Sequence, residues 1–313
     1  MTLIVVTHPD CLAHDPERGY PERPDRLRAA LRGINALPDT QRLEAREVTR
    51  EQMLRVHDEN YLDLLDRVEH RVEARGGGVV ALDSDTPAGP GTMRASRLAA
   101  GACVQAVEAV LDRPGAPAFA VVRPPGHHAE PGRAMGFCFH AGLAIAAAHA
   151  LEREDIRRVA LCDFDVHHGN GTEAAARART DMLFVSSHQM PLYPLSGDPA
   201  DNVAGHIVNA ALAPGDGSEA FRHTWRESLL PAIDEFAPDL VLVSAGFDAH
   251  ARDPLAQVEL DDEDFFWIGS ELKRLADKHA KGRLAAALEG GYDLQALEAG
   301  VHAFARGISG PSG

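Results

Sequence analysis

Short apolar runs alternate with longer amphipathic stretches along most of the 313-residue chain. The runs are rich in β-branched residues and almost free of charge, which is typical of strands buried on both faces of a sheet. One strand is expected within the first eight residues. Six more are expected at Ala118–Val122, Val159–Cys162, Leu183–Ser186, Ile207–Asn209, Leu240–Ser244 and Leu284–Leu288.

Between most of these runs, apolar residues recur at helical spacing. Helices are expected at Arg26–Leu37, Tyr61–Ala74, Thr92–Leu111, Gly142–Leu151, Thr172–Ala178, Glu219–Phe236, Asp262–Lys278 and Leu294–Arg306, with a further helix start at Thr49. Repeated strand–helix alternation indicates an α/β fold with three αβα layers and a mostly parallel central sheet. No repeat or break in composition divides the chain, so we expect a single domain over residues 1–313.

Composition and charge narrow the class of protein. With 45% hydrophobic and 25% charged residues, the chain resembles an ordinary soluble domain, and no run approaches the roughly 18 apolar residues of a membrane span. The four cysteines are scattered with no Cys-x-x-Cys motif, so they indicate neither a thiolate zinc site nor a disulfide framework, and this predicts a cytoplasmic location. The net charge of −16 argues against a nucleic-acid partner and favours a cationic small molecule or a basic peptide.

One segment changes character within a few residues. The apolar run Val159–Leu161 is followed by Asp163-Phe164-Asp165-Val166-His167-His168-Gly169-Asn170-Gly171. Alternation along an extended chain places Asp163, Asp165 and His167 on one side. These groups would repel or desolvate one another unless a cation lay among them, and the donor set suits a zinc-like divalent ion. The structural alternative is an aspartate-rich strand end that caps the next helix.

Polar or glycine-rich segments follow five of the predicted strands. They are Arg123-Pro124-Pro125-Gly126-His127-His128, Asp163–Gly171, Ser187-His188, Ala245-Gly246-Phe247-Asp248 and Glu289-Gly290-Gly291-Tyr292-Asp293. In an open parallel sheet, sites are built outside the carboxyl ends of the strands. Convergence of five such segments on one edge is harder to explain by structural roles than any single motif, so it predicts a functional site there.

The residue types in these segments suggest a hydrolytic metal site. Asp248 could be a third metal ligand beside two from the Asp163–Gly171 segment, although it could also serve as a helix cap or a turn residue. Three ligands would leave coordination open for water and substrate, as catalytic zinc requires. A histidine base from His127-His128 and a hydroxyl donor from Tyr292 would then suffice for amide or ester hydrolysis.

Taken together, these ordered motifs resemble those of the histone deacetylase family in the arginase–deacetylase superfamily. They are similar to bacterial class II-like deacetylases and acetylpolyamine amidohydrolases. The resemblance runs from about His8 to Tyr292 and includes Pro21–Pro24 and Gly136-Phe137-Cys138. It implies the arginase–deacetylase fold and zinc-dependent deacetylation of an N-acetylated amine. The substrate would be acetyl-lysine in a protein or peptide, or an acetylated polyamine.

Two metal sites follow from this resemblance. One zinc ion per chain would be bound by Asp165, His167 and Asp248. A nearby potassium ion, structural in role, would be bound by Asp163, Ser186, the Ser187 carbonyl, and the backbone oxygens of Asp165 and His167.

The resemblance also implies catalytic roles. His128 would be the general base, with His127 beside it as an electrostatic or general-acid partner. Tyr292 would polarise the acetyl carbonyl together with zinc. Asp163 would contact His127, and Asn170 would contact His128. Asn170 stands where class I members carry aspartate, which makes the predicted site class II-like.

The expected substrate tunnel has an aromatic pair, Phe137 and Tyr193, together with Leu255, Gly136 and Gly290. Leu255 stands where a polyamine-selective relative carries a glutamate, and this disfavours polyamine specificity. Elsewhere His140 replaces a frequent asparagine, and Leu195-Ser196-Gly197-Asp198 replaces the usual glycine-threonine-glycine after Tyr193-Pro194. The second change alters the rim and therefore leaves substrate choice open.

Three alternatives stay open beside protein deacetylation. The first is an acetylpolyamine deacetylase. The second is an arginase-like binuclear manganese enzyme, which needs more metal ligands than these motifs offer. The third is a catalytically silent acyl-lysine-binding module, which the presence of every expected catalytic residue disfavours. Long loops at Pro9–Pro24 and Ala81–Gly91 could make a contact in a homo-oligomer that narrows the tunnel.

Overall fold

The centre of the molecule is an eight-stranded sheet in which every neighbouring pair of strands is parallel. The computed structural model describes residues 1–15 and 19–310. In spatial order the strands are β2 (Thr40–Glu44), β1 (Leu3–Thr7), β5 (Ala118–Ala120), β10 (Leu284–Leu288), β9 (Leu240–Ala245), β6 (Val159–Asp163), β7 (Met182–Gln189) and β8 (Ile207–Leu212). A small antiparallel pair, β3 (Val80–Ala81) and β4 (Pro87–Ala88), lies apart from this sheet.

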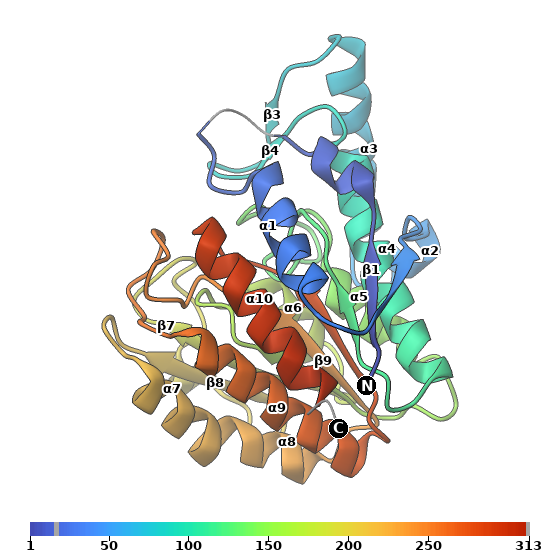
Figure 1. Cartoon of the computed structure of the whole chain (residues 1–313). Helices are drawn as coiled ribbons and strands as arrows, with labels where there is room; N and C mark the ends of the chain where they lie inside the picture. Colours follow the sequence, from blue (N-terminus) through green and yellow to red (C-terminus); the bar gives the residue numbers. More distant parts are fainter. Residues whose placement is uncertain (16–18, 311–313) are drawn as a thin grey trace.

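Helices cover the sheet and complete the three-layer αβα architecture (Figure 1). They are η1 (Pro9–Ala13), α1 (Pro24–Asn35), α2 (Arg50–Met53), α3 (Glu59–Ala74), α4 (Thr92–Asp112), α5 (Gly142–Ala150), α6 (Asn170–Arg177), η2 (Pro199–Asp201), α7 (Ser218–Thr224), η3 (Trp225–Leu229), α8 (Leu230–Phe236), α9 (Asp262–His279) and α10 (Leu294–Ser309). Helix α10 packs against both α1 and α9. Helix α4 packs against α5. Among the described residues, no helix is long and apolar enough to cross a membrane.

The predicted strands are present, and those near the middle of the sheet are the most buried. Every residue of β6, β7, β9 and β10 is buried, as expected for strands that are covered on both faces. Strand β2 was not expected. Its sequence Thr-Gln-Arg-Leu-Glu has no apolar run, because an edge strand is only partly covered and can carry polar side chains.

Two helical segments also differ from expectation. The stretch 219–236 is not one uniform helix, because the π-helical turn Trp225–Leu229 separates α7 from α8. The expected loop Pro9–Pro24 contains a short 3₁₀ helix, η1, in which Pro9 supplies a fixed φ at the start. Residues 16–18 of that loop lie outside the described part of the chain.

Strand register aligns the carboxyl ends that carry the polar segments. Asp163, the last residue of β6, is paired with Ser186 of β7 on one side and with Ser244 of β9 on the other. On the far side of β9, Leu288 of β10 is paired with Ala245. Segments that are distant in sequence therefore emerge side by side at one edge of the sheet, as the rule for open parallel sheets requires.

Candidate active site

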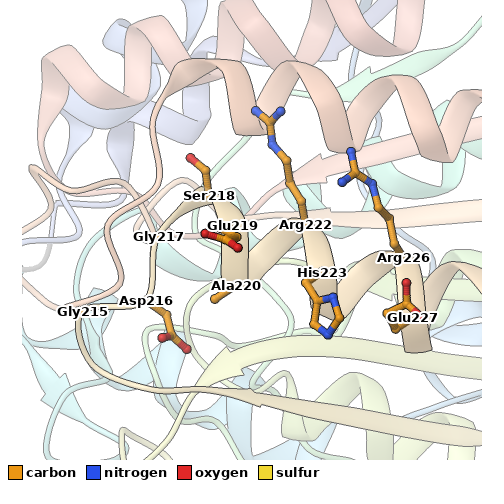
Figure 2. Close-up of a pocket in the computed structure, with 10 residues that line it drawn as sticks. All are labelled: Gly215, Asp216, Gly217, Ser218, Glu219, Ala220, Arg222, His223, Arg226 and Glu227. Atoms are coloured by element: carbon orange, nitrogen blue, oxygen red, sulfur yellow. The ribbon is translucent and has the colours of Figure 1, made fainter.

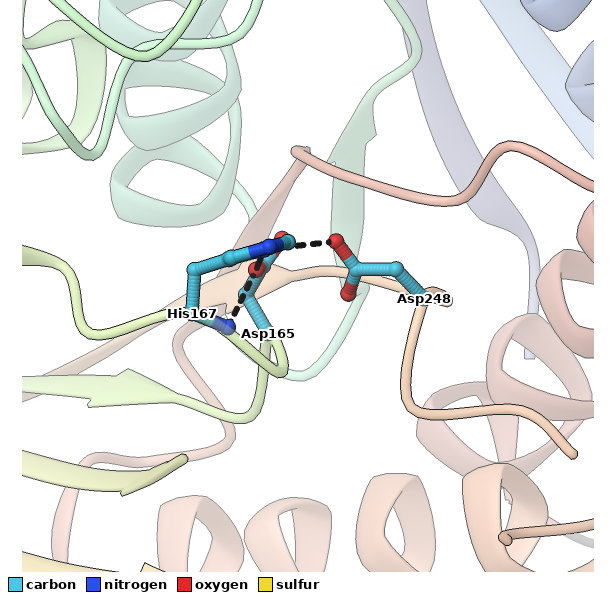
Figure 3. A group of neighbouring side chains, drawn as sticks. All are labelled: Asp165, His167 and Asp248. Carbon is cyan, nitrogen blue, oxygen red and sulfur yellow. Dashed lines mark hydrogen bonds and ion pairs between the residues drawn. The ribbon is translucent and has the colours of Figure 1, made fainter. Parts of the chain in front are cut away.

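Three residues from the ends of β6 and β9 form a buried group with the composition of a metal site (Figure 3). Ligand atoms of Asp165, His167 and Asp248 all lie within 4.8 Å of one another. His167 Nδ1 is 3.1 Å from Asp165 Oδ1 and 3.1 Å from Asp248 Oδ2. Both carboxylates are completely buried. Two carboxylates and one imidazole match the oxygen and nitrogen ligands of a catalytic zinc site and leave a further position open.

Backbone groups orient the two carboxylates. Asp165 accepts hydrogen bonds from the His167 N–H (2.9 Å) and the Gly290 N–H (2.8 Å), and Asp248 accepts one from the Val166 N–H (3.0 Å). A Cβ on Gly290 would lie 2.0 Å from Asp248 Oδ2, so only glycine allows this close approach. The Gly290 backbone therefore packs directly against the carboxylates of Asp165 and Asp248. It is not among the residues that line the cavity described below, where the sequence predicted it.

The charges of this group favour a bound cation. Burial alone would lower the pKa of His167, but Asp165 and Asp248 outweigh burial and raise that pKa to about 10. For Asp248, burial and the nearby Asp165 carboxylate raise the pKa above its usual value. The protonated His167 ring thus stabilises the ionised form of each carboxylate, whereas the negative charge of the other carboxylate destabilises it. Because a divalent ion would neutralise both carboxylates at once, the donor set fits the metal predicted from the sequence.

Two adjacent histidines lie beside this group, and each has a different partner. Their ring centroids are 4.0 Å apart. His127 Nδ1 is 3.1 Å from Asp163 Oδ2, and His128 Nδ1 is 2.8 Å from Asn170 Oδ1. The Asn170 amide nitrogen donates to Glu130 Oε1 at 2.8 Å, which fixes the amide oxygen toward His128. His128 must therefore carry its proton on Nδ1, and Nε2 keeps a free lone pair.

The environments of the two histidines separate their pKa values. Burial acts to lower the pKa of His127, but Asp165 and Asp163 outweigh it and raise the pKa to about 10. Burial and the neighbouring His127 lower the pKa of His128 well below its usual value. One ring is thus a cation and the other a neutral base. Such divergence within a pair of titratable groups is characteristic of acid–base sites.

A cavity of about 250 Å³ opens above these groups. It is lined by Asp85, His128, Gly136, Phe137, His167, Leu192, Tyr193, Leu255 and Tyr292. The structure thus brings four predicted tunnel residues together with His128, His167 and Tyr292; these four are Phe137, Tyr193, Leu255 and Gly136. Asp85 lies in the acidic part of the loop Ala81–Gly91 and was assigned no role from the sequence. Leu192 was not assigned either, because nothing in its local pattern distinguishes it from an ordinary loop residue.

The wall formed by Gly136 and Phe137 is held in an unusual backbone conformation. Both residues have positive φ, +56° and +66°, and such values are uncommon for a bulky residue like phenylalanine. Their N–H groups donate to Asp85 Oδ1 and Thr86 Oγ1, each at 3.2 Å. A Cβ on Gly136 would lie 2.3 Å from the His128 ring. The glycine therefore lets the wall close directly over the histidine.

A larger depression of about 1140 Å³ runs along α7 and η3 (Figure 2). Its lining mixes acidic and basic side chains, including Glu219, Arg222 and Arg226, and includes none of the predicted site residues. Volume alone would select this depression. The converging histidines, carboxylates and tyrosine select the smaller cavity, because catalytic sites are identified by geometry and chemistry together.

The residues expected to bind potassium lie close to the metal group. Asp163 accepts a hydrogen bond from the Asp165 N–H at 3.1 Å, and it lies opposite Ser186 in the β6–β7 pairing. Ser186 Oγ is 2.9 Å from His188 Nδ1, and Ser187 Oγ accepts from the Trp225 indole at 3.0 Å. The cluster matches the predicted residues, whereas potassium binding by them stays a prediction.

A buried ionic network behind the site was missed from the sequence. Glu22 is fully buried and accepts hydrogen bonds from Arg123 (2.8 Å) and Arg26 (3.1 Å), while His14 Nε2 lies 3.1 Å away. Arg26 also donates to the Gly291 carbonyl at 2.6 Å, and its guanidinium lies 4.8 Å from the centre of the Tyr292 ring. The motif around Pro21–Pro24 indicated that this loop matters but gave no partner for Glu22.

Replacing Glu22 by glutamine should lower the free energy of unfolding by about 3–5 kcal/mol, because Arg123 and Arg26 would lose their buried counter-charge. Urea unfolding at pH 7 measures the change. Burial would raise the pKa of Glu22, but Arg123 and His14 outweigh it and depress the pKa below its usual value. The stabilisation is therefore present above the pKa of an unfolded carboxyl, about 4.3, and is lost as pH falls further.

The control is Glu298→Gln, which removes an exposed pair with Arg32 (2.7 Å) and should change stability by less than about 1 kcal/mol. Equal losses for the two variants would contradict the role assigned to Glu22. The difference between Glu22→Gln and the unaltered protein should also shrink as the solution is acidified below about pH 4.

Comparison with known sequences identifies relatives of this chain. Residues 20–308 match the histone deacetylase domain. A histone deacetylase-like amidohydrolase of Pseudomonas aeruginosa is 38% identical over 282 residues, which cover 88% of this chain and 73% of the relative. A probable deacetylase of Archaeoglobus fulgidus is 35% identical over 300 residues, covering 93% of this chain and 81% of the relative.

Solved structures agree with the sequence relatives. The crystal structure of the HDA15 HD domain superposes with a TM-score of 0.91 and 30% identity, over 99% of this chain and 89% of that chain. An acetylpolyamine aminohydrolase from Burkholderia pseudomallei superposes with a TM-score of 0.86 and 30% identity, over 96% and 97% of the two chains. The matched domain, the identities and the shared architecture lead to one conclusion: this chain belongs to the histone deacetylase family.

Proposed function

We propose that this protein is a zinc-dependent deacetylase that hydrolyses the amide bond of an N-acetylated amine, with acetyl-lysine in a peptide or protein as the preferred class. The observation that carries the proposal is the convergence of the Asp165–His167–Asp248 group, the histidine pair and Tyr292 at one cavity of about 250 Å³, which His128, His167 and Tyr292 line. Such a cavity suits a slender aliphatic chain that delivers an amide to its base.

Asp165, His167 and Asp248 would hold the zinc ion, which when bound supplies Lewis-acid polarisation of the amide carbonyl and lowers the pKa of the attacking water. His128 Nε2, which keeps its lone pair, takes the proton as the water oxygen bonds to the carbonyl carbon. His127 stays cationic beside Asp163 and stabilises the negative charge that develops.

Tyr292 donates its hydroxyl proton in a hydrogen bond to the carbonyl oxygen. Burial raises the pKa of this phenol well above its usual value, so it stays protonated at neutral pH. The carbon–nitrogen bond then breaks, and the proton held by the histidine pair passes to the departing amine nitrogen. The products are acetate and the free amine.

Substrate preference rests on the walls of the cavity. Phe137, Leu192 and Leu255 give it an apolar surface that suits the methylene chain of lysine. Leu255 places no charge where a cationic polyamine would gain from one. One solved neighbour is nevertheless named an acetylpolyamine aminohydrolase, so an acetylated polyamine is the second candidate substrate. The potassium site, the cytoplasmic location, the single-domain organisation and any homo-oligomer stay predictions.

An assay of acetyl-lysine peptide and N-acetylputrescine, each with and without a metal chelator, tests the proposal. We expect hydrolysis of the peptide to exceed that of the polyamine, chelation to abolish both, and added Zn²⁺ to restore both. Preference for N-acetylputrescine would favour the polyamine alternative. Activity that survives complete metal removal would overturn the mechanism.

A further inference from the structure

One buried carboxylate outside the metal group contacts two walls of the cavity at once. Asp253 lies in the connection between β9 and α9 and is only 7% exposed. Its Oδ1 accepts a hydrogen bond from the Leu255 N–H at 3.0 Å. Its Oδ2 accepts from the Tyr292 N–H at 2.6 Å and from the Asp293 N–H at 3.3 Å. Leu255 and Tyr292 both line the cavity.

Tyr292 depends on such contacts because its local backbone is not part of a helix or strand. It lies between the end of β10 and the start of α10, directly after Gly291, whose φ is +120°. Arg26 fixes the Gly291 carbonyl before it. Asp253 fixes the N–H of Tyr292 itself and that of Asp293, the N-cap of α10. The peptide unit between Gly291 and Tyr292 is thus held at its carbonyl by Arg26 and at its N–H by Asp253.

We propose that Asp253 is a positioning residue that sets the Tyr292 hydroxyl and the Leu255 wall relative to each other, so that the carbonyl-binding end and the side of the cavity are fixed by one side chain. The inference rests on the proposed deacetylase function and extends it to a residue outside the reacting groups. Displacement of a catalytic group by about 1 Å can lower a rate about 100-fold.

The pKa of the Asp253 carboxyl determines the pH at which its variants should be assayed. Burial and the charge of Asp248 raise its pKa to about 7, while the three N–H donors act in the opposite direction. At pH 8 most of the carboxylate is therefore ionised, and both oxygens are available as acceptors. Assays at this pH compare the unaltered residue with its variants in one defined state.

The test is Asp253→Asn, which keeps the side-chain volume but replaces one acceptor oxygen with an amide NH₂ group that donates hydrogen bonds and accepts none. We expect kcat for acetyl-lysine peptide to fall about 10- to 100-fold with metal content unchanged. The matched control is Asp239→Asn. Asp239 accepts two backbone hydrogen bonds, from Arg157 (2.9 Å) and Arg158 (3.1 Å), at the opposite end of β9, and its loss should leave kcat unchanged.

A double-mutant cycle distinguishes positioning from general destabilisation. If Asp253 acts through the phenol, Asp253→Asn should lower kcat far less in a Tyr292→Phe background than in the unaltered protein. If the losses in kcat caused by Asp253→Asn and by Tyr292→Phe multiply in the double variant, the two residues act independently and the proposal is overturned. If Asp253→Asn proves too unstable to assay, Asp253→Ser offers a second route. Added formate should restore part of kcat to that variant and none to Asp239→Ser.

Amide hydrogen exchange gives a readout that does not require activity. The Tyr292 and Leu255 amides should exchange faster in Asp253→Asn than in the unaltered protein, whereas they should be unaffected in Asp239→Asn. Unchanged exchange at Tyr292 would overturn the positioning role even if the protein is a deacetylase. Faster exchange in a protein that hydrolyses no acyl amine would leave the role of Asp253 in place and overturn the proposed function.

Discussion

Asp165→Ala is expected to remove the metal ion and abolish hydrolysis of acetyl-lysine peptide. Asp165 is one of three candidate metal ligands whose side-chain atoms lie within 4.8 Å of one another, and it also accepts the Gly290 N–H. The loss in kcat should exceed the roughly 10²- to 10³-fold that removal of one oxyanion donor causes, because both water activation and carbonyl polarisation depend on the metal. Elemental analysis, together with the peptide assay, measures both effects.

Asp181→Ala is the control for this prediction. Asp181 is paired with Arg179 at 2.7 Å, outside the site residues, and its loss should leave metal content and activity unchanged. Activity that persists in Asp165→Ala would contradict the proposed mechanism. Two tightly bound metal ions per unaltered chain would instead support the binuclear alternative.

Tyr292→Phe should lower kcat about 10²- to 10³-fold while the chain keeps its metal, because only the hydroxyl that stabilises the oxyanion is lost. KM should change little, since the phenyl ring preserves the apolar contact with Phe137, whose ring centroid is 5.9 Å away. The loss should be constant from about pH 6 to 9, because the pKa of the phenol is raised well above that range. Steady-state kinetics across this range measure it.

Tyr61→Phe separates this effect from the general loss of a buried hydroxyl. Tyr61 donates to the Phe139 carbonyl at 2.6 Å, and its replacement should cost about 1 kcal/mol of stability without changing kcat. Full activity in Tyr292→Phe would contradict the oxyanion role. Tight binding of a hydroxamate by the unaltered protein, without turnover of any acyl substrate, would favour the silent binding module.

The sequence predicted the fold well where burial is strongest. Runs such as Leu284–Leu288 are apolar because both faces are covered, so their composition alone identifies them. It failed at β2, where an edge strand needs no apolar run, and at Trp225, where the helix changes to a π-helical turn just before Pro231. Strand β2 depends on tertiary packing rather than on local pattern. The break in the helix had a local signal, because Pro231 has no N–H to bond the carbonyl of residue 227.

The candidate site was predictable only in part from local pattern. Alternation placed Asp163 with Asp165 and His167, but the structure separates them: Asp163 faces His127, whereas the other two meet Asp248. That third residue is brought near by the pairing of β6 with β9, which sequence order does not reveal. Family resemblance supplied this grouping.

Buried supporting residues were the hardest to predict. Glu22 and Asp253 each have one partner in a distant segment, Arg123 and Tyr292, which lie 101 and 39 residues away. The sequences around them resemble ordinary polar loops. Only the folded chain shows that each side chain is buried and hydrogen-bonded. A buried charge is recognised by its partners, and these are set by topology.

The place of β10 in the sheet has a consequence for how the protein is made. β2, β1 and β5 form one half-sheet, and β9, β6, β7 and β8 form another; among the described strands only β10 joins them. The histidine pair follows β5, whereas the candidate metal ligands follow β6 and β9. The loops that carry them contact each other directly, as His127 does Asp163, so these groups can meet before β10 is made. The continuous sheet forms only after residues 284–288 have left the ribosome and inserted, and Tyr292 follows them in the chain. The complete site should therefore arise only in a late step of synthesis.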